Sequence, residues 1–295
     1  MGGRDHSLVA GRTGWNFRRS NNVDPDWGND LLVMPACRNM SVLVLESATL
    51  HGSDYPVPYP TYFHPRSDAD VLRWQDRVRG QRRTWLTAFV GAPRPDVPVN
   101  IRVWDHVIAQ CFCARRPAPA PCWGARAPPG APSATPRATS RLFQKTVFCR
   151  QPPGDTCTRR SAFDSMVAGC IPVYRWHLPE DHHRYSVYIP DADVRQRNVS
   201  IEAVLRAIPP ATVERMREEV IRLIPRVLYA DPRSRLETLK DAEDIAVEGI
   251  LGTVARIRNG EYVDSGGPVT EDHPNLFSST ETRFRQKQSM QAADH

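Results

Sequence analysis

Two adjacent arginines, Arg159 and Arg160, occupy an electrostatically unfavourable place in this sequence. They follow a turn-forming run at residues 152–155 (PPGD), and the pattern at residues 161–168 predicts a helix that Gly169 ends. The positive end of the helix dipole disfavours cations in this first turn by ~0.3–1 kcal/mol. A bound phosphate or pyrophosphate would reverse that balance, because each charge-assisted hydrogen bond to it contributes ~1.5–3 kcal/mol.

The same stretch offers further groups for holding an anion. A helix that starts after a Pro/Gly turn presents free N–H groups to a ligand, here at the Gly154-Asp155 turn. The side chain of Asp155 or Thr158 can cap the helix, and Asp164 lies four residues after Arg160. The residues alone leave two interpretations open, an anion site or a surface ion pair beside a solvated arginine. A P-loop is excluded, because no GxxxxGK[ST] motif occurs.

Composition excludes several other classes of protein. The chain has 295 residues, 40% of them hydrophobic, and a net charge of +6. Its basic residues are scattered without an aromatic-interleaved stripe, which disfavours a nucleic-acid partner. No apolar run approaches the ~18 residues of a membrane span, and the first residues lack signal-peptide character. The seven cysteines show no common zinc spacing but permit disulfides in an oxidising compartment, so no metal site is expected.

Apolar strands and helical patterns alternate along the chain, which predicts an α/β domain with a largely parallel sheet. In such sheets ligands bind beyond the carboxyl ends of the strands, where loops lead into helices. Strands are predicted at Ser7–Ala10, Leu31–Met34, Val42–Leu45, Trp85–Val90 and Ile171–Val173. Helices are predicted around Val71–Val78, Val103–Ile108, Val213–Leu228 with a kink at Pro225, and Leu236–Ile250.

Two regions interrupt this alternation. Residues 114–141 are rich in Pro, Ala and Arg, which predicts a disordered insertion. Residues 259–295 are polar without periodicity, which predicts a disordered tail.

Several blocks of the sequence resemble one known family. The stretch QPPGDTCTRRSAFDSMVAGCIPV at Gln151–Val173 resembles the signature of plant exostosin-type glycosyltransferases, and within them that of xyloglucan galactosyltransferases. Further blocks match in the same order over most of Gly2–Arg258, at Gly2–Arg19, Val57–Pro65, Phe89–Pro95 and Leu223–Ser234.

The resemblance implies a GT-B-like architecture of two Rossmann-like domains that face each other across a cleft. Residues 1–62 would be a remnant of the acceptor-side domain, and residues 63–258 the nucleotide-sugar-binding domain. In the family, a membrane anchor, a stem and most of a first Rossmann domain precede the GGRDH block at which this chain starts. The amino-terminal lobe is therefore expected to be largely missing. The family also implies an anchored Golgi protein with a luminal catalytic domain.

The implied activity is that of an inverting hexosyltransferase without a cofactor or metal. It would transfer a sugar, galactose from UDP-galactose or a related donor, to a cell-wall polysaccharide such as xyloglucan. The alternative is a catalytically inactive, truncated family member that at most binds nucleotide or partners. By resemblance, Asp164 would accept hydrogen bonds from the ribose, and Asp5 and His6 would act on the acceptor side. The other residues expected to bind the nucleotide sugar are Gly154, Asp155, Thr158, Arg159 and Arg160.

Overall fold

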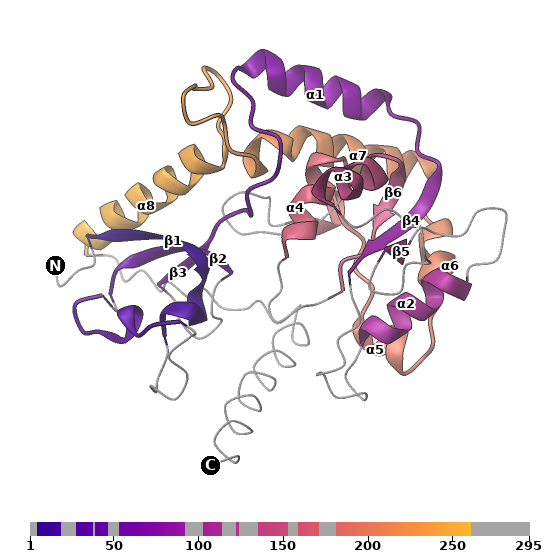
Figure 1. The fold of residues 1–295 in the computed structure, drawn as a ribbon, viewed down its shortest axis with the longest axis horizontal. Coiled ribbons are helices and arrows are strands. Elements are labelled where there is room, and N and C mark those ends of the chain that lie inside the picture. Colours follow the sequence, from indigo (N-terminus) through magenta and orange to yellow (C-terminus); the bar gives the residue numbers. More distant parts are fainter. Residues whose placement is uncertain are drawn as a thin grey trace, which may run out of the picture. The chain divides into compact units, whose positions relative to one another are not determined.

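The chain folds as two compact units (Figure 1). The computed structural model describes residues 5–18, 28–37, 39–46, 53–91, 103–113, 122–123, 135–152, 159–170 and 181–260. Unit 1 comprises Met1–Pro58, Pro153–Arg159 and Glu243–His295. Unit 2 comprises Tyr59–Pro152 and Arg160–Ala242.

Unit 1 contains a three-stranded parallel sheet in the order β1-β2-β3 (Figure 1). Its strands are β1 (Ser7–Thr13), β2 (Ser41–Glu46) and β3 (Asp54–Pro56). The central strand is buried along residues 41–44, as expected for an apolar run between two parallel neighbours. A buried, bidentate ion pair joins Arg18 to Asp54 at 2.8 and 2.5 Å. Helix α8 (Ala242–Arg258) lies almost entirely in this unit.

The predicted strand at Leu31–Met34 is wrong, because Leu31–Val33 forms a 3₁₀-helix instead. The Asn29 side chain accepts a hydrogen bond from the Leu31 amide at 3.1 Å, which starts a local turn. Pro35 follows and has no amide hydrogen for a strand ladder. The predicted strands around Val42 and Ser7 are confirmed.

Unit 2 contains a second parallel sheet, in the order β5-β4-β6. Its strands are β4 (Trp85–Val90), β5 (Cys122–Trp123) and β6 (Thr146–Cys149). Ala88 and Phe89 are adjacent on β4 and point to opposite faces of the sheet, and both are buried. The sequence-based prediction of an α/β fold with parallel strands is therefore confirmed, although the strands form two small sheets.

Helices cover both faces of this second sheet (Figure 1). On one side, Phe89 packs in a cluster with α2 (Val103–Cys113), α5 (Asp191–Arg195) and α6 (Ile201–Arg206). On the other side, Ala88 packs with α3 (Pro136–Gln144) and with Ala168 at the end of α4 (Arg160–Val167).

A further helical layer packs against α4. The buried residues Phe163 and Met166 of α4 contact Val220 and Leu223 of α7 (Pro210–Leu223), which in turn packs on α1 (Asp68–Gly80). The predicted kink at Pro225 is a change of helix type, because α7 continues as a 3₁₀-helix over Ile224–Val227. Proline has no amide hydrogen and so cannot extend the α-helical hydrogen-bond ladder.

The predicted disordered insertion at residues 114–141 is corrected in part, since β5 and the start of α3 lie within it. Thr135 caps α3 by accepting from the Ala138 amide at 3.3 Å, and Pro136 occupies the first turn. Ser/Thr before Pro is a helix-start signal, which the proline-rich context conceals in the sequence. The predicted helix from Leu236 begins only at Ala242, and its residues 243–258 group with unit 1 rather than with residues 63–242.

Some predictions fall outside the described residues. These are the strand at Ile171–Val173, most of the proposed insertion, and the tail from residue 261 to residue 295. The assignment of the two segments to acceptor-side and donor-side lobes stays a prediction.

Candidate functional site

The PPGD motif connects the carboxyl end of a parallel strand to the beginning of a helix. Strand β6 ends at Cys149 and α4 begins at Arg160, as the sequence predicts for this helix. Gln151 and Ser161 pin the two ends of the connection together. The Ser161 hydroxyl donates to Gln151 Oε1 at 2.8 Å, and the Gln151 side-chain amide donates to the Ser161 carbonyl at 3.3 Å. The end of β6 and the start of α4 thus lie together at the edge of the sheet at which α/β proteins bind ligands.

The carboxyl end of α4 is anchored by a Schellman turn. The Gly169 amide donates to the Met166 carbonyl, and the Cys170 amide to the Ser165 carbonyl, both at 2.7 Å. Gly169 has φ +86°, which an L-residue adopts only with strain. The predicted end of the helix at this glycine is therefore confirmed.

Two side chains from other elements complete this anchor. Trp74 donates its indole N–H to the Val167 carbonyl at 2.8 Å. The Arg83 guanidinium donates to the carbonyls of Ala168, Phe143 and Thr146 at 2.8, 2.7 and 3.0 Å. A cation at a helix carboxyl end is favourable, so Arg83 fixes α4 on the sheet even though burial lowers its pKa. Sequence reasoning missed Arg83, which lacks any motif of its own.

The apolar stripe of α4 fixes which way its polar side chains face. The stripe predicted from the sequence is confirmed as buried, since Phe163 and Met166 are fully enclosed and Ala162 and Val167 are nearly so. The helix therefore has one possible orientation on its neighbours, and its remaining face carries Arg160 and Asp164.

Arg160 and Asp164 form the predicted i,i+4 pair, with 3.7 Å between Arg160 Nε and Asp164 Oδ2. The Arg160 guanidinium also lies 4.5 Å from the centre of the Tyr62 ring, a cation–π contact that holds it over the helix start. Tyr62 itself is 54% exposed. Sequence reasoning missed this tyrosine, although it lies in the VPYPTYFHP block that carries the family resemblance.

Asp164 is a poorly solvated carboxylate. Burial raises its pKa from 3.8 to about 6, and the nearby Arg160 charge lowers it only in part. Among the described residues, Arg160 is its only charged partner, and the 3.7 Å separation is too long for a strong hydrogen bond. Its oxygens can therefore accept hydrogen bonds from a ligand that replaces the lost water.

A buried cation, Arg150, lies at the carboxyl end of β6. Arg150 directly follows β6, is 8% exposed, and donates to the Val107 carbonyl at 3.3 Å. Burial lowers its pKa to about 10, against a smaller opposing effect of Glu202, so the side chain stays charged at neutral pH. Arg150 adds positive potential at the carboxyl end of β6, and sequence reasoning missed it.

The structure describes three of the remaining predicted site residues, Arg159, Asp5 and His6. Arg159 is half-buried and directly precedes α4. Asp5 and His6 are an exposed pair, with His6 Nδ1 3.1 Å from Asp5 Oδ1. They lie at the amino end of β1, where the His6 carbonyl accepts from the Ser41 amide. Gly154, Asp155 and Thr158 lie outside the described residues.

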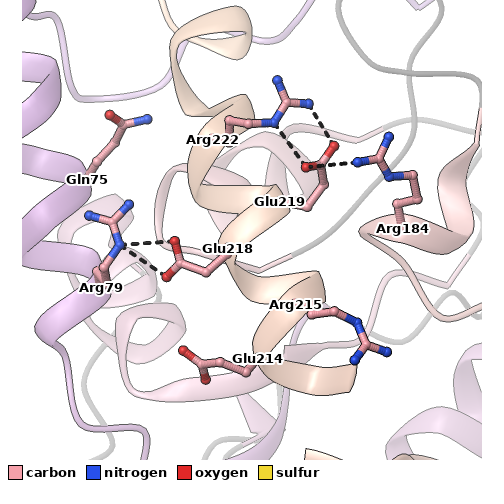
Figure 2. A pocket seen from close by; sticks show the side chains of 8 residues that line it. All are labelled: Gln75, Arg79, Arg184, Glu214, Arg215, Glu218, Glu219 and Arg222. Carbon is pink, nitrogen blue, oxygen red and sulfur yellow. Dashed lines mark hydrogen bonds and ion pairs between the residues drawn. The ribbon is translucent and has the colours of Figure 1, made fainter. Parts of the chain in front are cut away.

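A hollow of about 600 Å³ lies elsewhere on unit 2, beside α1 and α7 (Figure 2). Its opposite charges are largely paired, for example Arg79 with both Glu218 oxygens at 3.1 Å and Arg222 with Glu219 at 2.7 and 3.0 Å. None of its lining residues belongs to β6 or α4, so it is separate from the PPGD site. They are Gln75, Arg79, Arg184, Glu214, Arg215, Glu218, Glu219 and Arg222.

Two features are absent from the described part of the chain. It contains no helix that is both long and apolar enough to cross a bilayer. Within the same residues, no three His, Cys, Asp or Glu side chains gather where they could hold a metal ion.

Residues 1–205, which include β6, the PPGD motif and α4, match the family model of the exostosin GT47 domain. The chain belongs to the exostosin GT47 family. This confirms the resemblance that the sequence blocks indicate, and it implies a glycosyltransferase fold for the mixed α/β structure.

Several proteins of Arabidopsis thaliana are similar to this chain over most of its length. Xyloglucan galactosyltransferase MUR3 of Arabidopsis thaliana is 50% identical over 268 residues, which are 88% of this chain and 42% of that protein. The probable xyloglucan galactosyltransferase GT12 of the same plant is 39% identical, over 88% of this chain and 51% of that protein. The xyloglucan-specific galacturonosyltransferase 1 of Arabidopsis thaliana is 37% identical, over 86% of this chain and 39% of that protein. The chain thus spans about half or less of the length of these relatives.

Proposed function

We propose that this chain provides the donor site of a hexosyltransferase that moves galactose, or a related hexose, from a UDP-sugar to xyloglucan. One observation carries the proposal. Parallel strand β6 ends shortly before helix α4, which begins at Arg160, directly follows Arg159 and bears the desolvated carboxylate of Asp164 on its polar face. The names of the relatives support xyloglucan as the acceptor and galactose as the transferred hexose.

In this proposal the pyrophosphate of the donor binds at the start of α4. Backbone amides at Gly154-Asp155 and a helix cap from Asp155 or Thr158 are proposed to complete this anion site. Arg159 and Arg160 neutralise the negative charge that grows on UDP as the glycosidic bond breaks. Tyr62 keeps Arg160 in place through the cation–π contact.

Asp164 is proposed to accept hydrogen bonds from the ribose hydroxyls. Because its pKa is about 6, the carboxylate is ionised at neutral pH and can only accept, which suits two hydroxyl donors. The residue lies one turn beyond Arg160 on the same face of α4. A ribose joined to the pyrophosphate would extend along this face.

The chemical step is proposed to be a single inverting displacement. An acceptor hydroxyl attacks the anomeric carbon, its proton passes to a general base, and the bond from carbon to the UDP oxygen breaks. Asp5 and His6 are proposed on the acceptor side, with the carboxylate orienting the imidazole. Their support is the family block alone, because an exposed pair at a strand start is also an ordinary surface feature.

The two units, each with a parallel sheet, support a GT-B arrangement as part of the proposal. Residues 1–62 would contribute to the acceptor-side lobe and residues 63–258 to the donor lobe. The family also supports a Golgi location with the catalytic part in the lumen. One relative named for galacturonic acid shows that the family resemblance alone does not select the donor sugar.

Calorimetric titration of UDP at fixed salt tests the donor site. Arg159→Ala should weaken binding ~10- to 100-fold, the equivalent of one charge-assisted hydrogen bond. Arg160→Ala should cost less, because this side chain is 46% exposed. Arg82→Ala, at an exposed arginine outside the site, is the matched control and should bind UDP as the wild type does.

A second comparison addresses how Arg160 is held. Tyr62→Leu should weaken UDP binding ~2- to 5-fold through loss of the cation–π contact, whereas Tyr62→Phe keeps the ring and should bind normally. Wild type that binds no UDP at millimolar concentration would reject the donor site. UDP binding without galactosyl transfer from UDP-galactose to a xyloglucan oligosaccharide would favour a catalytically inactive, nucleotide-binding member.

A further inference from the structure

Two cysteines bracket the candidate donor site. Cys149 is the last residue of β6, and Cys170 follows the glycine that ends α4. The whole connection from strand to helix end, including the PPGD loop and both arginines, lies between them. Neither thiol is used by the proposed chemistry.

The fold brings these two side chains to the same place. The Cys170 thiol lies on β6, where its sulfur is 3.3 Å from the Val147 carbonyl oxygen and 3.8 Å from that of Thr146. Cys149 packs against the cluster that contains Ala168, two residues before Cys170. The Schellman turn at Gly169 and the Arg83 hydrogen bonds fix the approach of Cys170 to the strand.

We propose that Cys149 and Cys170 form a disulfide that ties the end of β6 to the end of α4. The proposal rests on the luminal location given under the proposed function, because thiols are oxidised stably only in such compartments. The oxidant is a protein or glutathione disulfide of the secretory pathway.

The reaction balances as two exchanges. The Cys149 thiolate, the more accessible of the two, attacks the donor disulfide, forms a mixed disulfide and releases one donor thiolate. The Cys170 thiolate then attacks the Cys149 sulfur and releases the second donor thiolate. Two electrons pass to the donor, and the two protons lost by the cysteines end on its two thiols.

The surroundings favour a permanent structural bond over a reactive switch. Burial, together with a hydrogen bond and charge repulsion between the Cys149 and Cys170 side chains, raises the pKa of Cys149, and Arg83 opposes this only in part. A raised thiol pKa lowers the thiolate fraction at neutral pH and slows exchange once the protein has folded. The bond would restrict the ends of the PPGD loop even when no donor is bound.

Tryptic peptide mapping tests the bond directly. The chain would be expressed through a eukaryotic secretory pathway, alkylated without reduction and digested. Trypsin separates the three nearby cysteines into Thr146–Arg150, Gln151–Arg159 and Ser161–Arg175, which contain Cys149, Cys157 and Cys170 in that order. A linked pair of the first and third peptides, lost on reduction, is the expected result. Alkylated free Cys149 and Cys170, or a link from either to Cys157, would overturn the proposal.

Thermal unfolding gives a second measurement. Dithiothreitol should lower the melting temperature of the wild type by about 5–10 °C, the size expected for opening a short closed loop. The Cys149→Ser/Cys170→Ser double variant should melt at the same temperature with and without the reductant. Cys37→Ser, the matched control, should keep the wild-type response, and an equal response of the double variant would overturn the proposal.

The same samples separate this inference from the proposed function. A mapped Cys149–Cys170 bond without UDP binding would keep the disulfide and reject the donor site. UDP binding by protein in which Cys149 and Cys170 are both free thiols would keep the donor site and reject the disulfide.

Discussion

Replacing Asp164 by asparagine should stabilise the fold and weaken the donor site at the same time. The carboxylate is 13% exposed, and burial raises its pKa from 3.8 to about 6. Because the folded-state pKa is the higher one, the stability associated with protonated Asp164 is fully present below pH ~4. It is lost as the pH rises through about 6. Asparagine resembles the protonated acid and avoids this loss.

The magnitude follows from the shift of about two pKa units. At 1.36 kcal/mol per unit, ionised Asp164 lowers the free energy of unfolding by about 3 kcal/mol at neutral pH. The attraction to Arg160 is already contained in this net shift. Asp164→Asn should therefore match the wild type near pH 4 and exceed it by up to about 3 kcal/mol at pH 7.5. Its affinity for UDP should fall ~5- to 10-fold, because a neutral amide is a weaker acceptor for the ribose hydroxyls.

Urea unfolding of both proteins at pH 4.5, 6 and 7.5 measures the first effect, and UDP titration at pH 7.5 the second. Asp193→Asn is the matched control, since it removes another i,i+4 pair, with Arg197 at 3.2 Å, from a more exposed carboxylate. It should change the unfolding free energy by no more than ~0.5 kcal/mol at any of these pH values. An Asp164→Asn protein that is less stable than wild type at pH 7.5 would refute the desolvation argument. Unchanged UDP affinity would refute the ribose contact.

Two further predictions concern the anchor of α4. Gly169→Ala should lower the free energy of unfolding by at least ~2 kcal/mol, because φ is +86° and the new Cβ would lie 2.6 Å from the Arg83 guanidinium. Gly252→Ala, in open space on α8, should instead raise it by ~0.5–1 kcal/mol, and an equal effect of the two changes in urea unfolding would contradict this reasoning. Arg83→Met should cost ~3 kcal/mol or more through three lost hydrogen bonds to carbonyls, whereas Arg82→Met, at the exposed neighbour, should stay within ~0.5 kcal/mol. Equal melting temperatures for these last two variants would show that Arg83 does not hold the helix.

Features with a local cause could be predicted from the sequence. The helix at α4 and its end at Gly169 follow from an apolar stripe and a residue that tolerates positive φ. The Arg160–Asp164 pair follows from helical spacing alone. The parallel α/β class follows from alternating strand and helix patterns, each of which is read over a few residues.

Sequence patterns did not predict the correct element where two local preferences compete or where the segment is short. The apolar run at Leu31–Val33 forms a 3₁₀-helix, because a side chain from Asn29 starts a turn that hydrophobicity does not report. The start of α3 at Pro136 was concealed by its proline-rich surroundings. Strand β6 has only four residues and therefore too short a pattern to stand out.

Only the tertiary structure decided how the site is assembled. Arg83 hydrogen-bonds to residues 60 to 85 positions away in the chain, and the Tyr62 contact with Arg160 also joins distant segments. The pKa of Asp164 depends on the removal of water by neighbouring elements. Sequence spacing determines which side chains share a face of one helix. Packing determines which faces meet, and the desolvation and long-range hydrogen bonds that tune a site arise only from that meeting.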